Sequence, residues 1–257
     1  MTAAPAFAQP GTDVNDGIAF ELAEFIRDAA NNAPRSLQTT LGPSEAGIPC
    51  DRRLAYKLAG WQQPNGGGDP LASVIGTGFH SWAADAFSRP ELGGRFLVEE
   101  HLTIAPPFVP GGHCDLFDTF YDRVLDWKVV GKSSYDKYRS QGPRPQYRVQ
   151  AHTYGLGWEI KGRTVREVGI ILIPRQSARL SDIWVWTEPY DRQIAVNAIK
   201  RVATIQQLTT ALNVREQPAM FGVIPATPGH ECTYCPFYKP GSKDFGEGCP
   251  GNLPPTR

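Results

Sequence analysis

The sequence predicts an α/β protein whose core is followed by an irregular, cysteine-rich segment. Two observations predict this class. Helical periods come first along the chain, then a group of β-rich runs, and then a helix, further strands and a long helix, which is the order of an α/β core. From Gly222 to the end, Pro, Gly and Cys are frequent and no regular period is visible.

Composition and length narrow the functional classes. A chain of 257 residues, 41% of them hydrophobic, is long enough for one large domain with a sizeable core. Lys and Arg together number 26, as do Asp and Glu, so the formal charge is zero and a nucleic-acid site must be a local patch. The apolar runs are too short for a membrane span, and residues 1–11 lack the basic and apolar regions of a signal peptide. We therefore expect a cytoplasmic protein without a membrane partner.

The elements follow from local patterns. Residues 1–16 are expected to be a disordered tail and residues 17–257 a single domain. Apolar side chains at helical spacing predict helices over about 16–30, 50–60, 71–87, 146–159 and 190–213. Alternating or β-rich runs predict strands over 96–104, 113–120, 124–130, 168–173 and 183–187. Residues 131–145 are expected to be a polar, basic connection.

The second and third predicted strands form a hairpin around the turn at 121–123. An antiparallel pair with this turn places Asp115 opposite the region of Asp126 and Lys128, which project from one strand face. Two carboxylates that share space repel each other unless a cation lies between them, and oxygen ligands suit Mg²⁺ or Mn²⁺. A lysine beside such a metal could orient water or stabilise a phosphoryl transition state. The hairpin alone fits an exposed face with a cross-strand Asp–Lys pair equally well.

Four motifs in order resemble those of the PD-(D/E)XK nuclease superfamily, and the last is similar to the Q-x-x-x-Y helix of its RecB-like branch. They are Gly76-Thr77-Gly78-Phe79-His80, Gly112-His113-Cys114-Asp115, Asp126-Trp127-Lys128 and Gln150-Ala151-His152-Thr153-Tyr154. The resemblance implies a central mixed sheet flanked by helices. It also implies metal ligands at His80, Asp115 and Asp126, a catalytic lysine at Lys128, and site- or DNA-orienting residues at Gln150 and Tyr154. His101, His113 and His152 match no role in the motifs and are interpreted as structural.

A basic stretch lies between the lysine and the last motif. Against the single acid Asp136 it carries five positive charges, interleaved with tyrosines, at Lys132, Lys137, Arg139, Arg144 and Arg148. On a neutral chain this local excess predicts contacts with DNA phosphates, with the tyrosines available to stack on frayed bases. The alternative is an ordinary solvated loop.

Four of the five cysteines form a split pattern, one early and three late: Cys50, Cys232, Cys235 and Cys249. Cysteines in a cytosolic chain point to metal ligation, and the spacing fits a Cys₄ zinc site as well as an iron–sulfur cluster. The fifth, Cys114, points away from the face of Asp115 at strand spacing and is interpreted as packing.

The split pattern resembles that of RecB-like iron–sulfur nucleases, including CRISPR-associated exonucleases and their phage relatives. The run from Ser44 through Cys50-Asp51-Arg52-Arg53-Leu54-Ala55-Tyr56 and the run Cys235-Pro236-Phe237 carry this resemblance. It implies a 4Fe–4S cluster on the four cysteines, with residues 222–257 plus Cys50 as the cluster region. The thirteen-residue gap before Cys249 is longer than the family pattern. Because the C-terminal region has few regularly spaced apolar residues, we expect metal ligation to be its main source of order.

These features predict a metal-dependent DNA exonuclease of recombination, repair or phage DNA processing, acting on single-stranded or end-frayed DNA. Digestion from ends is implied by the resemblance and not by the residues. Three alternatives stay open: a factor that trims DNA for CRISPR spacer acquisition, a non-catalytic DNA-binding module with structural zinc, and a nuclease whose substrate is RNA. The sequence sets neither the polarity of digestion nor any homo-oligomer or recombination partner.

Overall fold

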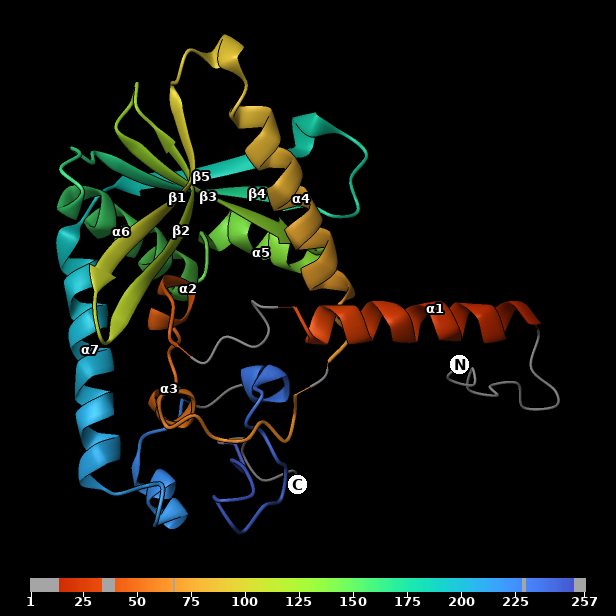
Figure 1. The fold of residues 1–257 in the computed structure, drawn as a ribbon, viewed down its shortest axis with the longest axis vertical. Coiled ribbons are helices and arrows are strands. Elements are labelled where there is room, and N and C mark those ends of the chain that lie inside the picture. Colours follow the sequence, from red (N-terminus) through yellow and green to blue (C-terminus); the bar gives the residue numbers. More distant parts are fainter. Residues whose placement is uncertain (1–13, 34–39, 67, 228–229, 252–257) are drawn as a thin grey trace, which may run out of the picture.

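The computed structural model describes residues 14–33, 40–66, 68–227 and 230–251. Its centre is a five-stranded sheet in chain order: β1 (Phe96–Ala105), β2 (Val109–Asp118), β3 (Arg123–Val130), β4 (Glu167–Pro174) and β5 (Trp184–Pro189) (Figure 1). Neighbouring strands are antiparallel except β3 and β4, which are parallel. The predicted α/β class, a mixed sheet flanked by helices, is therefore confirmed.

Helices cover both faces of the sheet because β3 alternates apolar side chains between them. Leu125 and Trp127 pack with Ala83 of α4 (Leu71–Phe87) on one face. Val124 and Val130 belong to a second core, shared with α6 (Pro145–Ile160) on the other face. The long helix α7 (Arg192–Ala211) packs against α6. The hairpin of β2 and β3 thus lies between two helix layers.

A third core joins α3 (Asp51–Leu58) and α7 to the C-terminal region. The ring of Tyr56 is fully buried and stacks on Phe221 with ring centroids 3.8 Å apart, and on Phe237 at 5.2 Å. Ile224 is also fully buried. The apolar residues of this region thus pack against α3 without a regular period, and this packing is a source of order beside the metal ligation expected from the sequence.

Two segments depart from the predicted elements. The stretch expected to be a connection contains α5 (Lys132–Gln141), which starts after Gly131 and stops at Gly142, whose φ of +78° ends the helix. Tyr135 and Tyr138 are the buried residues of α5, too few for a clear helical period. A short helix, α2 (Pro43–Ala46), also forms where no helix was predicted.

Strand β2 begins four residues earlier than predicted. The prediction started too late because Pro110, Gly111 and Gly112 resemble a turn in sequence. Gly111 is required there, since a Cβ at this position would lie 2.0 Å from the backbone oxygen of Leu102 on β1. The glycine therefore permits close approach of two strands instead of ending one.

Helix α1 (Val14–Asn31) projects from the body of the molecule (Figure 1). It begins two residues before the predicted helix, within the expected tail, while residues 1–13 lie outside the described part of the chain. Its apolar side chains are solvent-exposed, among them Ile18, Leu22 and Phe25. No helix in the described part of the chain is long and apolar enough to cross a membrane.

Candidate functional site

The site is built where the β2–β3 ladder ends. The two strands pair from Asp118 opposite Arg123 to Leu116 opposite Leu125. At the next position, the Asp115 carboxylate takes the place of a backbone acceptor: its Oδ2 accepts a hydrogen bond from the backbone N–H of Trp127 at 2.8 Å. A side-chain oxygen is thereby held between two strands, and 8% of Asp115 remains exposed.

Asp126, one residue before Trp127, is 1% exposed and held by two partners. Its Oδ1 accepts a hydrogen bond from Nε2 of Gln150 on α6 at 2.8 Å. Its Oδ2 forms an ion pair with Nζ of Lys128. Burial raises the pKa of Asp126 to about 6, with the Lys128 charge opposing this rise and the Asp115 charge adding to it.

His80 on α4 supplies the imidazole of the site. Its Nδ1 lies 3.3 Å from Oδ1 of Asp115. Burial lowers the pKa of His80, but the hydrogen bond and charge of Asp115 and the charge of Asp126 outweigh burial and raise it. Burial likewise pushes the pKa of Asp115 upward, yet His80, Lys128 and the Trp127 N–H leave it below its ordinary value. The two carboxylates therefore differ, since the pKa of Asp126 is raised and that of Asp115 is lowered.

Glu99 on β1 is a site residue that the sequence reasoning missed. Ligand atoms of Glu99, His80 and Asp115 all lie within 4.8 Å of one another, a spacing at which one cation could contact all three. Glu99 has a φ of +50°, which breaks the regular strand geometry at this residue. Nothing in the β1 sequence, where Glu99 is followed by Glu100, distinguishes the acid that faces the site from the one that does not.

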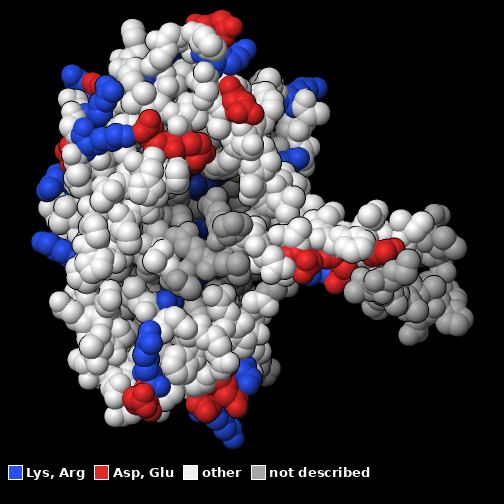
Figure 2. Space-filling view, in the orientation of Figure 1, with Lys and Arg blue, Asp and Glu red and all other residues white. Residues whose placement is uncertain are grey.

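All six predicted catalytic and metal residues line one cleft of about 740 Å³, formed by α2, α4, β1, β2, β3 and α6. These residues are His80, Asp115, Asp126, Lys128, Gln150 and Tyr154. His113, expected to be structural, also lines it, with Nδ1 2.8 Å from the backbone oxygen of Glu99. The face drawn in Figure 2 is hollowed near its middle, with basic atoms inside the hollow, while charges of both signs are scattered around it.

Of the five basic residues predicted to bind DNA, one lines the cleft and four do not. Arg144 lines the cleft, with its guanidinium 4.2 Å from the ring centroid of Tyr147, which Lys128 approaches to 5.0 Å from another direction. Arg53 on α3 also lines the cleft and was not predicted. The other four lie outside the lining: Lys132, paired with Asp136; Lys137; Arg139, over the ring of Tyr135; and Arg148, paired with Glu188.

The four cysteines of the split pattern line a second cavity, of about 260 Å³. Cys249 lies near the other three cysteines because it forms a β-bridge with Tyr238. In this bridge the Cys249 N–H donates to the backbone oxygen of Phe237 at 2.7 Å. Its sulfur accepts hydrogen bonds from the N–H of Gly251 at 3.4 Å and from Arg52 at 3.8 Å. Burial is the main cause that raises the pKa of the Cys235 thiol.

The fifth cysteine, Cys114, is fully buried in the core under α6 and accepts a hydrogen bond from Nε1 of Trp158 at 3.4 Å. Its interpretation as a packing residue is confirmed. Ile48 and Arg53 line both cavities, so the cysteine cavity and the cleft are adjacent.

No protein-family model and no curated protein matches the sequence. Among solved structures, the chain is similar to an alkaline exonuclease from Laribacter hongkongensis, with 13% identity, a TM-score of 0.48, and coverage of 70% of this chain and 94% of that one. A structure of the same exonuclease in complex with dAMP gives 13%, 0.48, 71% and 95%. A phage-related exonuclease from Haemophilus somnus 129PT gives 15%, 0.46, 65% and 82%. The function proposed below rests on the residues of the cleft.

Proposed function

We propose that this chain is a metal-dependent DNA exonuclease that hydrolyses phosphodiester bonds. The observation that carries the proposal is the convergence of Asp115, Asp126 and Lys128 in one cleft, with His80 and Glu99 beside them. Buried acids that share space need a cation, and a lysine held against them at low exposure suits the stabilisation of negative charge on a phosphate. An ordinary cross-strand ion pair does not account for the additional histidine and glutamate.

The donor set fits a divalent cation. Glu99 and Asp115 offer oxygens and His80 offers a nitrogen within one small volume, and Asp126 lies next to Asp115 with its own oxygens turned to Lys128 and Gln150. Carboxylate-rich sites suit Mg²⁺ or Mn²⁺. Such an ion supplies activated water and neutralises phosphate charge.

The chain's own residues prepare this chemistry. Gln150 fixes the orientation of the Asp126 carboxylate, and the Trp127 N–H fixes that of Asp115, so neither acid needs to reorganise. Lys128 is held at the cleft beside Asp126 and the ring of Tyr147, where its ammonium can meet the charge that develops on the phosphate. Tyr154, one turn after Gln150 on the same face of α6, is buried and also lines the cleft.

Arg53 and Arg144 provide the positive charge that a DNA strand would meet in the cleft. Both line it: Arg53 lies on α3, and Arg144 is the N-cap residue of α6. Tyr147, already beneath the Arg144 guanidinium, offers a ring on which an unpaired base can stack. Single-stranded or end-frayed DNA is therefore the substrate that we propose, and digestion from an end follows the motif resemblance.

We also propose that Cys50, Cys232, Cys235 and Cys249 hold a 4Fe–4S cluster rather than zinc. The four cysteines line one cavity of about 260 Å³, and the sulfur of Cys249 accepts hydrogen bonds from the Gly251 N–H and from Arg52. Hydrogen bonds to the sulfurs suit an iron–sulfur cluster, and the split cysteine pattern resembles that of iron–sulfur nucleases.

The deciding experiment compares linear and closed circular DNA. End-labelled linear single strands and duplexes and the matching circles are incubated with Mg²⁺ or Mn²⁺. We expect the linear strands to be degraded and the circles to survive, with all cleavage stopped by a chelator. Circles lost as fast as linear strands would replace exonuclease action with endonuclease action. Intact DNA of every form under all these conditions would refute the nuclease.

A further inference from the structure

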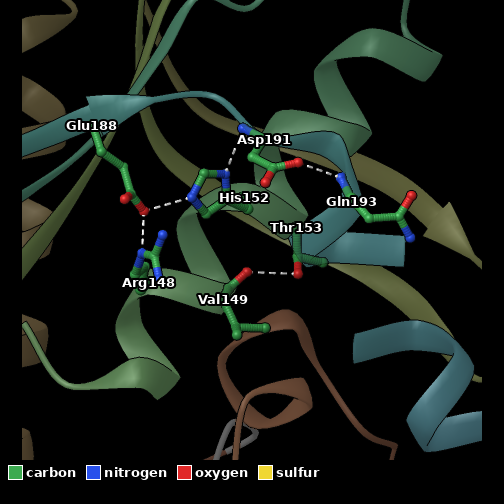
Figure 3. Close-up of polar contacts among 7 residues, drawn as sticks. All are labelled: Arg148, Val149, His152, Thr153, Glu188, Asp191 and Gln193. Carbon is green, nitrogen blue, oxygen red and sulfur yellow. Dashed lines mark hydrogen bonds and ion pairs between the residues drawn. The ribbon is translucent and has the colours of Figure 1, made fainter. Parts of the chain in front are cut away.

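The outer face of α6 makes a continuous contact that the proposed chemistry does not use. Arg148, His152, Gly155 and Glu159 follow one another at spacings of four, three and four residues, so they share one face of the helix. This face lies against the junction between β5 and α7, from Glu188 to Arg192 (Figure 3). Gln150 lies on the opposite, cleft-facing side of the same helix.

His152 is the centre of this contact and is 0% exposed. Its Nδ1 lies 3.1 Å from the backbone nitrogen of Asp191 and its Nε2 lies 2.7 Å from Oε1 of Glu188 (Figure 3). A backbone N–H can only donate, so Nδ1 is the acceptor and Nε2 carries the hydrogen that is donated to Glu188. The ring thus joins α6 to two other elements through one donor and one acceptor.

The partners of His152 are themselves fixed. Glu188 also receives the guanidinium of Arg148, one turn earlier on α6. Asp191 is the N-cap of α7, and its Oδ1 accepts the backbone N–H of Gln193 at 2.8 Å (Figure 3). Tyr190 stacks on the His152 ring at a centroid distance of 5.9 Å and an angle of 26°.

The contact leaves α6 little freedom to rotate. A Cβ at Gly155 would lie 2.5 Å from the Tyr190 ring, so the helix and the junction are already in close approach. Farther along, the Tyr190 hydroxyl donates to Oε2 of Glu159 at 2.8 Å. On the other side of α6, the bond from Gln150 to Asp126 depends on the rotation of the helix about its own axis, because adjacent residues point about 100° apart.

We propose that His152, through Glu188 and Asp191, is a positioning residue that fixes the rotation of α6 and so places Gln150 against Asp126. This inference rests on the proposed nuclease function. It also gives Arg148 a role within the same cluster, as the cationic partner of Glu188, in place of a phosphate contact.

A double-mutant cycle tests the inference. His152→Asn keeps an acceptor for the Asp191 N–H and removes the donor to Glu188, and Glu188→Gln, at a less buried position, serves if the first variant folds poorly. Each is combined with Gln150→Ala. Cleavage of linear DNA with Mg²⁺ and the binding of Mn²⁺ alone are both measured. If His152 acts through Gln150, its substitution should lower cleavage by about ten-fold and weaken Mn²⁺ binding, and both effects should shrink to within about two-fold in the Gln150→Ala background.

Equal fold losses in both backgrounds would overturn the inference, since simple destabilisation adds to the loss of Gln150 instead of merging with it. Glu167→Gln is the matched control: it removes the ion pair with Arg123, which lies outside the α6 contact, and should lower Tm while leaving Mn²⁺ binding unchanged. If wild-type protein binds Mn²⁺ but cleaves no DNA, the nuclease proposal fails while the Mn²⁺ cycle still decides the role of His152. Protein that binds no Mn²⁺ refutes both.

Discussion

The cleft and the cysteine cavity lie side by side but are assembled in opposite ways. Two acids of the cleft, Asp115 and Asp126, come from one hairpin and are held by close neighbours, such as Gln150 on Asp126. The cysteines come from both ends of the chain, and their segments are joined by side chains of α3 and its C-terminal flank that bind distant backbone oxygens. These bonds are Arg52 to Gly222 and Ile224, each at 3.0 Å, Tyr56 to Phe245 at 2.7 Å, and Trp61 to Gly246 at 2.9 Å.

The difference separates two sources of order. In the cleft, buried carboxylates repel one another unless a cation lies between them, so the arrangement that suits the proposed function lowers local stability. Around the cysteines, an apolar core under Tyr56 packs the C-terminal region against α3 and α7. The two sites should therefore respond differently when their ligands are removed.

The largest expected effect concerns the cysteines. Cys50→Ser and Cys235→Ser should each lose nearly all bound iron, although the two residues lie far apart in sequence, because both line one cavity. Iron content and the absorption of purified protein check this. Cys114→Ser is the control and should keep its iron, since Cys114 is buried elsewhere under Trp158. Full iron content in the Cys50 variant would disprove the split site, and stoichiometric zinc in wild type prepared without air would disprove the cluster.

A variant of the apolar core, compared with Cys50→Ser, separates the contribution of packing from that of metal ligation. Tyr56→Ala removes a fully buried ring and should cost about 3–5 kcal/mol of unfolding free energy. We expect it to expose the C-terminal region to proteases more than Cys50→Ser does. Limited proteolysis and thermal unfolding of the two variants side by side give the answer. Faster digestion of the serine variant would show that metal ligation is the main source of order in the C-terminal region.

Next in size is the effect of Lys128→Ala on catalysis. Loss of one preorganised charge stabiliser should lower kcat by about a hundred- to a thousand-fold, with folding and DNA affinity close to wild type. Single-turnover rates and DNA binding without divalent ions separate the two quantities. Lys200→Ala, at an exposed position of α7, is the matched control. A Lys128 variant within a few-fold of wild type would remove the lysine from the mechanism.

The smallest effect concerns the DNA path. Arg144→Gln and Arg53→Gln should each reduce the slope of log binding constant against log salt by about one, because each loses one phosphate contact. Arg139→Gln, on a residue outside the cleft lining, should leave the slope unchanged. Binding titrations at several salt concentrations measure this. The reverse ranking would place the DNA along α5 and not in the cleft.

Much of the cleft could be predicted because its chemistry is local. A hairpin fixes which residues face one another, so Asp115, Asp126 and Lys128 followed from strand alternation and one turn. His80 and Gln150 needed the motif resemblance, since nothing local brings two helices to a strand. Glu99 could not be predicted, because nothing in the β1 sequence distinguishes it from its neighbour Glu100 or indicates its positive φ.

The surroundings of the site were predicted less well, for reasons that differ by residue. Arg53 comes from a helix that reaches the cleft through the third core, a contact between distant segments. The core around Tyr56 and Phe237 has no sequence period, because its C-terminal partners lie on turns and short 3₁₀ segments. His152 lies inside a motif and is interpreted from the sequence as structural. The sequence alone does not reveal its contacts with Glu188 and Asp191.

Trp127 gives the cleft a reporter that needs no label. Its backbone N–H ends the β2–β3 ladder on the carboxylate of Asp115, a group that a cation would also engage. Its ring packs on Phe79 and Phe87 of α4, the helix that bears His80, with centroids 5.6 and 5.3 Å away. In an NMR spectrum, the backbone amide resonance of Trp127 would report on changes at the Asp115 carboxylate, and its indole resonances would report on movements of α4. One residue would therefore show whether the acid and the helix move together.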